Sequence, residues 1–291
     1  MIAEVRRFNR TATLRAGALS DHFLARGRAL WASRLLWEIG EEGCAVRMLR
    51  SRLALDSGQL SRTLRGLEAE GLVRLTTSPD DRRVRFAHLT PAGLAERAVL
   101  DERSDELASS ILQPLSEGQR AELVGAMRTV ERLITASLVE LRVVDPAGAD
   151  AQGCLRAYVA EVERRSGMHF DPARGTSAEP HELRAPAGAF LVAYLHDDPI
   201  GCGAIKHDPR GGPSEVKRMW VAESARGLGI GRRLLEKLEG LARERGAPAV
   251  RLDTNKSLVE AIAMYRSAGY AEVLRFNDEP LAHHWFEKPL A

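Results

Sequence analysis

The chain has 291 residues, of which 44% are hydrophobic and 28% charged, and a formal net charge of +2. This length fits two domains of about 150 residues each. No apolar run approaches the roughly 20 residues that span a bilayer, and the polar, arginine-bearing N-terminus is unlike a secretory leader, so we expect a cytoplasmic protein without membrane spans. The three cysteines, Cys44, Cys154 and Cys202, lack metal-ligand spacing, so we expect reduced thiols and no metal site.

Positive charge is unevenly distributed along the chain. Every lysine lies between Lys206 and Lys288, so the N-terminal half is basic through arginine alone. From Arg47 to Arg85 there are nine arginines and five acidic residues. This segment is a net-basic island.

Helical periodicity dominates the first 70 residues. The pattern predicts helices at Ile2–Leu19, Leu30–Gly40, Val46–Leu53 and Gly58–Glu70. The last two helices are joined by a short turn in which Asp56 or Ser57 can cap the following helix. Their spacing is that of a helix-turn-helix.

The second helix of this pair has two distinct faces. Leu60, Leu64 and Leu67 fall at positions i, i+4 and i+7 and form one apolar stripe. Arg62 and Arg65 lie on the opposite face. We therefore expect these two arginines to point away from the core.

A β-hairpin and further helices follow. Leu72–Thr76 and Val84–Leu89 have strand character around the turn at residues 78–81, which predicts a basic wing. Thr90 then caps a new helix, and Pro91 occupies its first position, where a missing N–H is tolerated. Gln119–Ala136 is predicted as the last helix of this half.

These features together resemble the MarR family of transcriptional regulators over residues 1–137. The residues that carry the resemblance are Ser57–Glu70, Gly71-Leu72-Val73, Asp80-Asp81-Arg82-Arg83 and Leu89-Thr90-Pro91-Ala92-Gly93. The resemblance implies a winged-helix domain that binds double-stranded DNA. It also implies a homodimer built by the terminal helices.

The resemblance further implies which residues contact DNA. The recognition helix enters the major groove and a wing arginine reaches the minor groove, where guanidinium groups bind phosphate or base edges. The candidates are Gln59, Ser61, Arg62, Arg65, Arg82 and Arg83. Solvated surface arginines are the alternative, and Asp81 either orients a wing arginine or is a solvated turn residue.

The second half, residues 138–291, alternates strands and helices. Strands are predicted at Val139–Val144, Ala189–Leu195, Ile200–His207, Glu215–Val221, Val250–Thr254, Tyr270–Phe276 and His284–Lys288, and helices at Gly153–Arg165, Gly229–Arg245 and Leu258–Ala268. This order predicts an α/β sheet. The short connection to the first half suggests domains that are held close together.

A glycine-rich loop lies between a predicted strand and a predicted helix. Its residues are Arg226-Gly227-Leu228-Gly229-Ile230-Gly231. Glycines let backbone approach an anion, and the first N–H groups of a helix lack intrahelical partners and lie at the positive end of the helix dipole. The loop therefore predicts a phosphate site.

The spacing of Arg226, Gly229 and Gly231, together with the order of elements, resembles the GNAT superfamily of N-acetyltransferases. The resemblance implies an acyl-CoA N-acyltransferase fold with acetyl-CoA as co-substrate. Its pyrophosphate would bind residues 226–231, and its pantetheine would bond the backbone of Met219 and Val221. The asparagine of many relatives would fall at Leu258, so Asn255, three residues earlier, is a further candidate contact for cofactor or substrate.

Two residues are candidates for acid–base chemistry. An ammonium must lose a proton before it attacks a thioester, and the departing thiolate needs a proton or a hydrogen bond. The resemblance implies Tyr265 as the acid and Glu215 as the base. The alternatives are an amphipathic aromatic packed at the sheet edge and a carboxylate paired with Lys217 or Arg218.

The sequence thus predicts a mainly α winged helix-turn-helix domain fused to an α/β N-acetyltransferase domain. The expected acceptor is a small primary amine or amino acid. Protein lysine is an alternative acceptor. A transcription factor whose second domain only senses acetyl-CoA or an amine is the alternative from another class of function.

Overall fold

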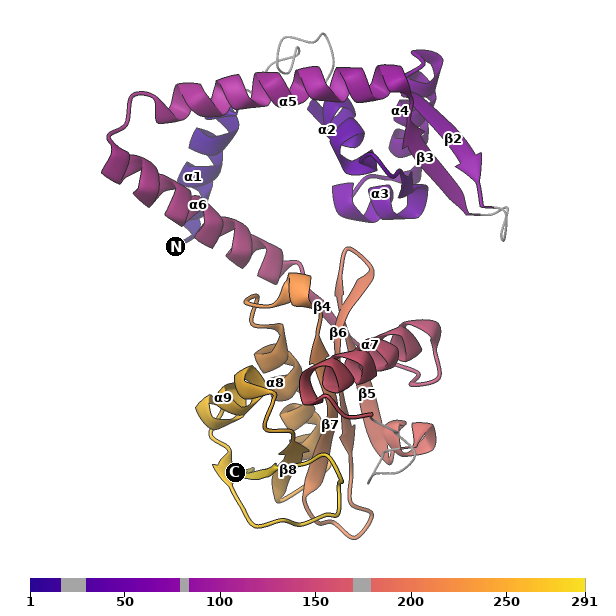
Figure 1. The fold of residues 1–291 in the computed structure, drawn as a ribbon, viewed down its shortest axis with the longest axis vertical. Coiled ribbons are helices and arrows are strands. Elements are labelled where there is room, and N and C mark those ends of the chain that lie inside the picture. The colour runs from indigo at the N-terminus through magenta and orange to yellow at the C-terminus, as the bar shows by residue number, and fades with distance from the viewer. Residues whose placement is uncertain (17–29, 79–83, 170–178, 291) are drawn as a thin grey trace. The chain divides into compact units, whose positions relative to one another are not determined.

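The computed structural model describes residues 1–16, 30–78, 84–169 and 179–290 (Figure 1). The chain forms two compact units, Met1–Met127 and Arg128–Ala291, and each is described by itself. The division falls inside helix α6 (Glu117–Ser137), whereas the helical pattern predicts a boundary at the end of that helix. No helix in the described ranges combines the length and the apolar character that crossing a bilayer requires.

The first unit contains the predicted helix-turn-helix and hairpin. Its elements are α1 (Ile2–Arg15), α2 (Leu30–Ile39), β1 (Cys44–Ala45), α3 (Val46–Leu53), α4 (Ser57–Ala69), β2 (Val73–Thr77), β3 (Arg85–Leu89) and α5 (Pro91–Leu112), followed by the first part of α6. Figure 1 shows α4 beside the β2–β3 hairpin at one end of α5. The three strands pair in the order β1-β3-β2, all antiparallel.

Helix α4 has the two faces that its sequence predicts. Asp56 caps it, because its Oδ1 accepts a hydrogen bond from the Gln59 backbone N–H at 2.9 Å. Its apolar stripe, Leu60, Leu64 and Leu67, is buried in the core of the unit, while Arg62 and Arg65 are exposed.

The motif that begins α5 ties this helix to the end of α4. The Thr90 hydroxyl accepts from the Gly93 backbone N–H at 3.1 Å and donates to the Gly71 carbonyl at 2.6 Å. A Cβ at Gly93 would lie 2.0 Å from the Leu72 carbonyl oxygen, so only glycine fits there. The motif therefore links the start of α5 to the residues that directly follow α4.

The second unit is an α/β fold. After α6 it contains β4 (Glu140–Val144), α7 (Ala149–Ser166), β5 (Gly188–Leu195), β6 (Asp198–Lys206), β7 (Ser214–Val221), α8 (Ile230–Glu244), β8 (Ala249–Thr254), α9 (Val259–Ser267), β9 (Ala271–Glu272) and β10 (His284–Pro289), with short 3₁₀ turns at Pro180–Leu183 and Glu223–Ala225. Within the described residues the strands form one sheet in the order β4-β5-β6-β7-β8-β10-β9. The β7–β8 pair is parallel and its neighbours are antiparallel.

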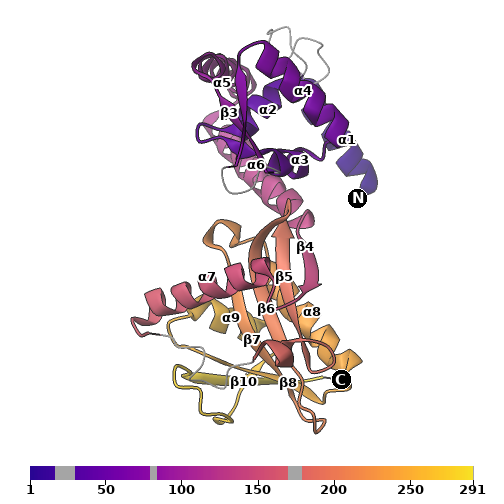
Figure 2. The same cartoon turned by 90° about the vertical axis from the view of Figure 1, so that its right-hand side faces the viewer.

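Helices cover both faces of this sheet (Figure 2). Successive side chains of a strand point to opposite faces, so Phe190 and Val192 of β5 join the core under α7, while Leu191 and Ala193 join the core under α8. Helix α9 contributes Tyr265 to the same core as α8. The continuous apolar run of β5 follows from this burial on both faces.

One predicted strand is much shorter than its pattern. The sequence predicts a strand at Tyr270–Phe276, but β9 contains only Ala271 and Glu272. Its chain leaves the sheet afterwards, because Arg275 donates to the Asn277 carbonyl and to Asp278 in a local turn. Leu274 is 92% exposed, whereas Tyr270 is buried and Val273 and Phe276 are half-buried, so the apolar residues of the predicted strand do not share one buried face.

Candidate functional site

Strands β7 and β8 diverge at the centre of the second unit. Their parallel register pairs only Ser214 with Val250 and Glu215 with Arg251. Beyond these pairs the register of β7 against β6 shifts, and Arg218 takes the positive φ of 57° that accompanies such a bulge. Met219 and Val221 follow on β7, where no residue of β8 is paired with the strand. The candidates for backbone contacts therefore lie beside the opening between the two strands.

The glycine-rich loop begins α8, as predicted. Gly227 and Gly229 have φ values of 80° and 74°, which L side chains rarely adopt, and a Cβ at either position would meet nothing within 4 Å. The N-terminus of α8 has no side-chain cap. The backbone at Gly227 and Gly229 thus adjoins open space directly before the uncapped N–H groups of α8, an arrangement that a bound phosphate can use.

The remaining loop residues pack against the hydrophobic core and so hold this backbone in place. Ile230 is buried and Leu228 packs against the same core. A Cβ at Gly231 would lie 3.0 Å from the Met264 sulfur, so glycine allows α8 and α9 to approach closely. The loop combines an open outer side with a packed inner side.

Tyr265 lies on α9 with its ring inside the core. Its side chain is 4% exposed, and its ring centroid is 6.0 Å from that of Tyr270 and 6.1 Å from that of Phe286. Burial, with smaller contributions from Tyr158 and Asp253, raises the pKa of Tyr265. Among the described residues, the fully buried polar atoms without a hydrogen-bond partner include the hydroxyl of the neighbouring Tyr270 but not that of Tyr265. The raised pKa keeps the Tyr265 hydroxyl protonated, so it can act as a donor.

A polar cluster occupies the strands beside Tyr265. Asp253 of β8 accepts from the Lys217 ammonium at 2.7 Å and from the Asn277 amide at 2.9 Å. Tyr158 of α7 is close enough to Asp253 for their charges to interact, and burial raises the pKa of Tyr158 to about 12. Burial alone would lower the pKa of Lys217, but Asp253 and Glu215 outweigh it and raise that pKa.

Glu215, the predicted base, is the second residue of β7. Its Oε1 accepts from the Arg251 guanidinium at 2.6 Å, and its Oε2 lies 3.2 Å from the Lys217 ammonium. Its side chain is 17% exposed. Glu215 is thus joined through Lys217 to Asp253, and both carboxylates belong to one ion-pair network.

Asn255, the predicted further contact, is buried at the end of β8. Its amide nitrogen donates to the Leu281 carbonyl at 2.7 Å, and its side-chain oxygen accepts from the Ser257 N–H at 2.9 Å. Both polar atoms are therefore bonded within the protein. A direct contact with a cofactor would require one of these bonds to be exchanged.

The candidates for DNA contacts lie in the first unit. Gln59 and Ser61 are half-buried on α4, and Arg62 and Arg65 are exposed on the same helix. The wing candidates Arg82 and Arg83 lie outside the described residues.

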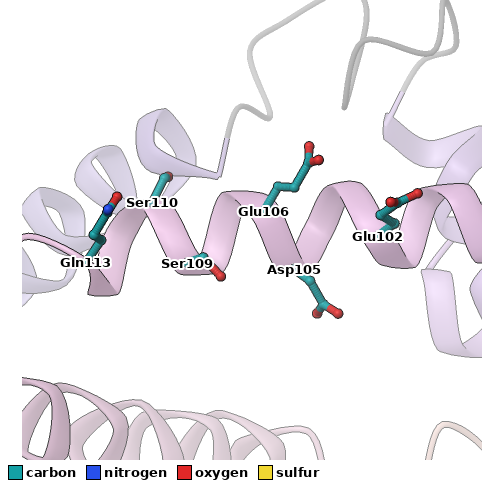
Figure 3. A pocket seen from close by; sticks show the side chains of 6 residues that line it. All are labelled: Glu102, Asp105, Glu106, Ser109, Ser110 and Gln113. Carbon is teal, nitrogen blue, oxygen red and sulfur yellow. The ribbon is translucent and has the colours of Figure 1, made fainter.

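A surface hollow on α5 has a different chemistry (Figure 3). Its lining residues are all polar: Glu102, Asp105, Glu106, Ser109, Ser110 and Gln113. Glu106 and Asp105 point to opposite sides of the helix. Three carboxylates repel phosphate, so this hollow fits neither DNA nor a nucleotide. Within the described ranges, no cluster of acidic, histidine or cysteine side chains could hold a metal ion.

Three residues near the site escape prediction from the sequence. Asp253 left a signal, because Arg251 and Asp253 alternate with buried residues and so mark one polar side of β8. Tyr158 and Glu161 of α7 left none, since their partners on the sheet side, Arg218 and Arg226, are 60 or more residues away in the sequence. Only the packing of α7 on the sheet brings them to the site.

Comparison with known proteins identifies both halves of the chain. The model of the acetyltransferase (GNAT) family matches residues 156–270, and the model of the MarR family matches residues 27–84. An IAA acetyltransferase of Azospirillum brasilense is 39% identical over 142 residues, which are 48% of this chain and 92% of that protein. The N-alpha-acetyltransferase RimI of Mycobacterium tuberculosis is 33% identical over 127 residues, which are 43% of this chain and 75% of that protein.

Among solved structures, a MarR-family regulator of Streptomyces coelicolor in complex with DNA is 22% identical to this chain and has a TM-score of 0.37. The match covers 45% of this chain and 84% of the regulator's chain. At such a TM-score the assignment depends on the family models and the sequence relatives. The predicted pairing of families is confirmed. The chain belongs to the GNAT acetyltransferase family through its C-terminal part and carries a MarR-family domain in its N-terminal part.

Proposed function

We propose that the protein transfers the acetyl group of acetyl-CoA to a small primary amine or amino acid and also regulates transcription through its MarR-family domain. One observation carries the enzymatic part. The open glycine loop, the diverging strands β7 and β8, and Tyr265 all contribute residues to the same core.

The residues of the loop fit a pyrophosphate. Gly227 and Gly229 leave open space beside the backbone, and the uncapped N-terminus of α8 supplies N–H groups and partial positive charge. The backbone of Met219 and Val221 would hold the pantetheine beside the opening between β7 and β8. Asn255 stays a candidate contact. When bound, acetyl-CoA supplies the thioester whose acetyl group is transferred.

Side chains of the protein would then carry out two proton transfers, one to the departing sulfur and one from the ammonium group. Tyr265 donates a proton to the departing sulfur, and its raised pKa keeps it protonated until then. Glu215 accepts the ammonium proton through water. Asp253 is a second candidate for this role, because its charge acts on Tyr265 directly. The variants Glu215→Gln and Asp253→Asn distinguish the two, since only loss of the base removes the acidic limb from the pH profile of kcat/KM.

The proposed acceptor class is supported by the carboxylates beside the opening. Asp253 and Glu279 both act electrostatically on the buried Tyr158, and carboxylates attract an ammonium group. A protein amino group is an alternative acceptor, which the relationship to RimI favours. A sensor that binds acetyl-CoA without turnover is the alternative from another class.

The test of the enzymatic proposal is release of free thiol. Purified full-length protein should release CoA thiol from acetyl-CoA with at least one member of a panel of small amines and amino acids. A peptide with a free α-amino group and a lysine peptide belong in the same panel. Binding of acetyl-CoA without thiol release for any acceptor would favour the sensor and contradict the enzyme.

The regulatory proposal concerns double-stranded DNA and a homodimer. Exposed Arg62 and Arg65 on the recognition helix support contacts with phosphate or base edges. Helices α1 and α6 support dimerisation, because neither buries a residue although both carry large apolar side chains. A second copy of the chain is the proposed occupant of these faces. A cytoplasmic location follows from a DNA partner and remains a prediction.

The DNA contacts can be tested by their dependence on salt. The double variant Arg62→Ala, Arg65→Ala should weaken duplex binding about tenfold or more and reduce the slope of log K against log salt by about one per lost phosphate contact. Arg103→Ala, which removes an exposed arginine of α5, is the matched control. Equal affinity of wild type and double variant would contradict the role of α4.

A further inference from the structure

An ion pair anchors the first residue of the glycine-rich loop to α7. The Arg226 guanidinium lies 2.8 Å from Oε1 of Glu161, which is 16% exposed. The same carboxylate accepts from Arg165 at 2.6 Å and from Arg164 at 2.7 Å. The Arg226 side chain is thus directed to α7, while the backbone that follows it adjoins open space.

The electrostatics of Glu161 favour a permanent pair. Burial by itself would raise the pKa of this carboxyl, but hydrogen bonds from Arg164, Arg226 and Arg165 outweigh it and lower the pKa to about 2. Glu161 therefore stays ionised at any pH at which the protein would be assayed.

The ion pair extends to the helix that carries Tyr265. Arg165 lies 2.6 Å from Glu260, which is in the first turn of α9. Glu161 is thus the centre of a chain of charges that joins α7 to the loop and to α9. Three guanidinium groups face two carboxylates in this chain, so its net charge is positive and does not repel a phosphate.

We propose that Glu161 is a positioning residue for the cofactor: through Arg226 it holds the backbone of residues 227–231 in the form that presents its N–H groups to a pyrophosphate. This rests on the proposed acetyl-CoA-dependent function. In this role Glu161 acts through Arg226 and does not itself contact cofactor or acceptor. Without the Glu161 carboxylate, the backbone of residues 227–231 keeps its sequence but is no longer anchored. Binding of the cofactor must then order this loop, which lowers the affinity.

The experiment compares CoA binding by the full-length wild type and by Glu161→Gln, using calorimetry. We expect the variant to raise the Kd about tenfold, because a hydrogen-bonded charge pair of this kind fixes the loop and tenfold corresponds to about 1.4 kcal/mol. The KM for acetyl-CoA should rise by the same factor while kcat at saturation is unchanged. A general structural defect would lower kcat as well.

Two further variants locate the effect. In an Arg226→Gln background the change Glu161→Gln should add nothing, since the bond is already broken. Arg164→Gln should leave the Kd within about twofold, because Arg164 contacts Glu161 but not the loop. If Glu161→Gln does not fold, Arg226→Gln tests the same bond from its more exposed end.

Unchanged or tighter CoA binding by Glu161→Gln, or an equal loss in the Arg226→Gln background, would overturn the positioning role. If the wild type itself does not bind CoA, the proposed acetyl-CoA-dependent function fails, and the positioning role fails with it. The two proposals therefore fail in different ways.

Discussion

Tyr265 is buried through its ring, which packs against Tyr270 and Phe286. Burial is also the largest cause of the raised pKa of its hydroxyl, which therefore stays protonated. A protonated hydroxyl can donate to a departing sulfur, which supports the acid role.

Replacement of Tyr265 by Phe should lower kcat about 100-fold or more and leave the affinity for acetyl-CoA nearly unchanged, because only the proton donor is lost. The acid acts only while protonated, and a raised pKa extends that range, so its loss as pH rises should begin above the ordinary tyrosine range. Steady-state kinetics at several pH values measure both effects. Tyr194→Phe, whose hydroxyl donates to Asp150, is the control. A variant with wild-type kcat would remove Tyr265 as the acid.

At the scale of elements, glycines mark the places where two elements approach closely. Gly93 lets α5 pass the Leu72 carbonyl, and Gly231 lets α8 pass Met264 of α9. In contrast, a Cβ at Gly66 on α4 would meet nothing within 4 Å. The same residue type is therefore required at some positions and replaceable at others.

The change Gly93→Ala should destabilise the first unit by about 1–3 kcal/mol, because the added Cβ meets a backbone oxygen that cannot move aside easily. Gly66→Ala, the matched control, should be neutral or stabilise α4 by up to about 1 kcal/mol, since alanine favours a helix. Chemical denaturation of the full-length chain measures both. Equal stability of the two variants would show that the Leu72 carbonyl does not constrain α5.

At the scale of the molecule, α1 and α6 expose several large apolar side chains within the described residues. Ile2 and Val5 of α1 are 79% and 59% exposed, and Leu133 and Ile134 of α6 are 54% and 53% exposed. Helices without a buried face gain little stability from a single chain. A homodimer would bury these faces and present two recognition helices to a duplex.

The double variant Leu133→Asp, Ile134→Asp should shift the protein toward the mass of one chain and weaken duplex binding, because charges are costly to bury in an interface. Sedimentation equilibrium and duplex titration are the measurements. Leu274→Asp, at a residue 92% exposed outside the helices, is the control. An unchanged mass for the double variant would exclude these residues of α6 from the interface.

The sequence by itself determined both families and most elements. Local periodicity, the Asp56 and Thr90 caps and the glycine spacing at residues 226–231 are short-range properties, so they can be read without a fold. The predicted length of β9 was wrong, because the length of a strand depends on the neighbouring strand with which it pairs and not only on its own sequence pattern.

Only the tertiary structure decided which charged groups meet. Glu161 reaches Arg226 across 65 positions, and Lys217 joins Asp253 across 36, through the packing of α7 and the divergence of β7 and β8. Such pairs leave no periodic trace, because each partner is an ordinary polar residue of its own element. The glycine-rich loop at the start of α8 was therefore predictable, whereas the ion pair between its Arg226 and Glu161 of α7 was not.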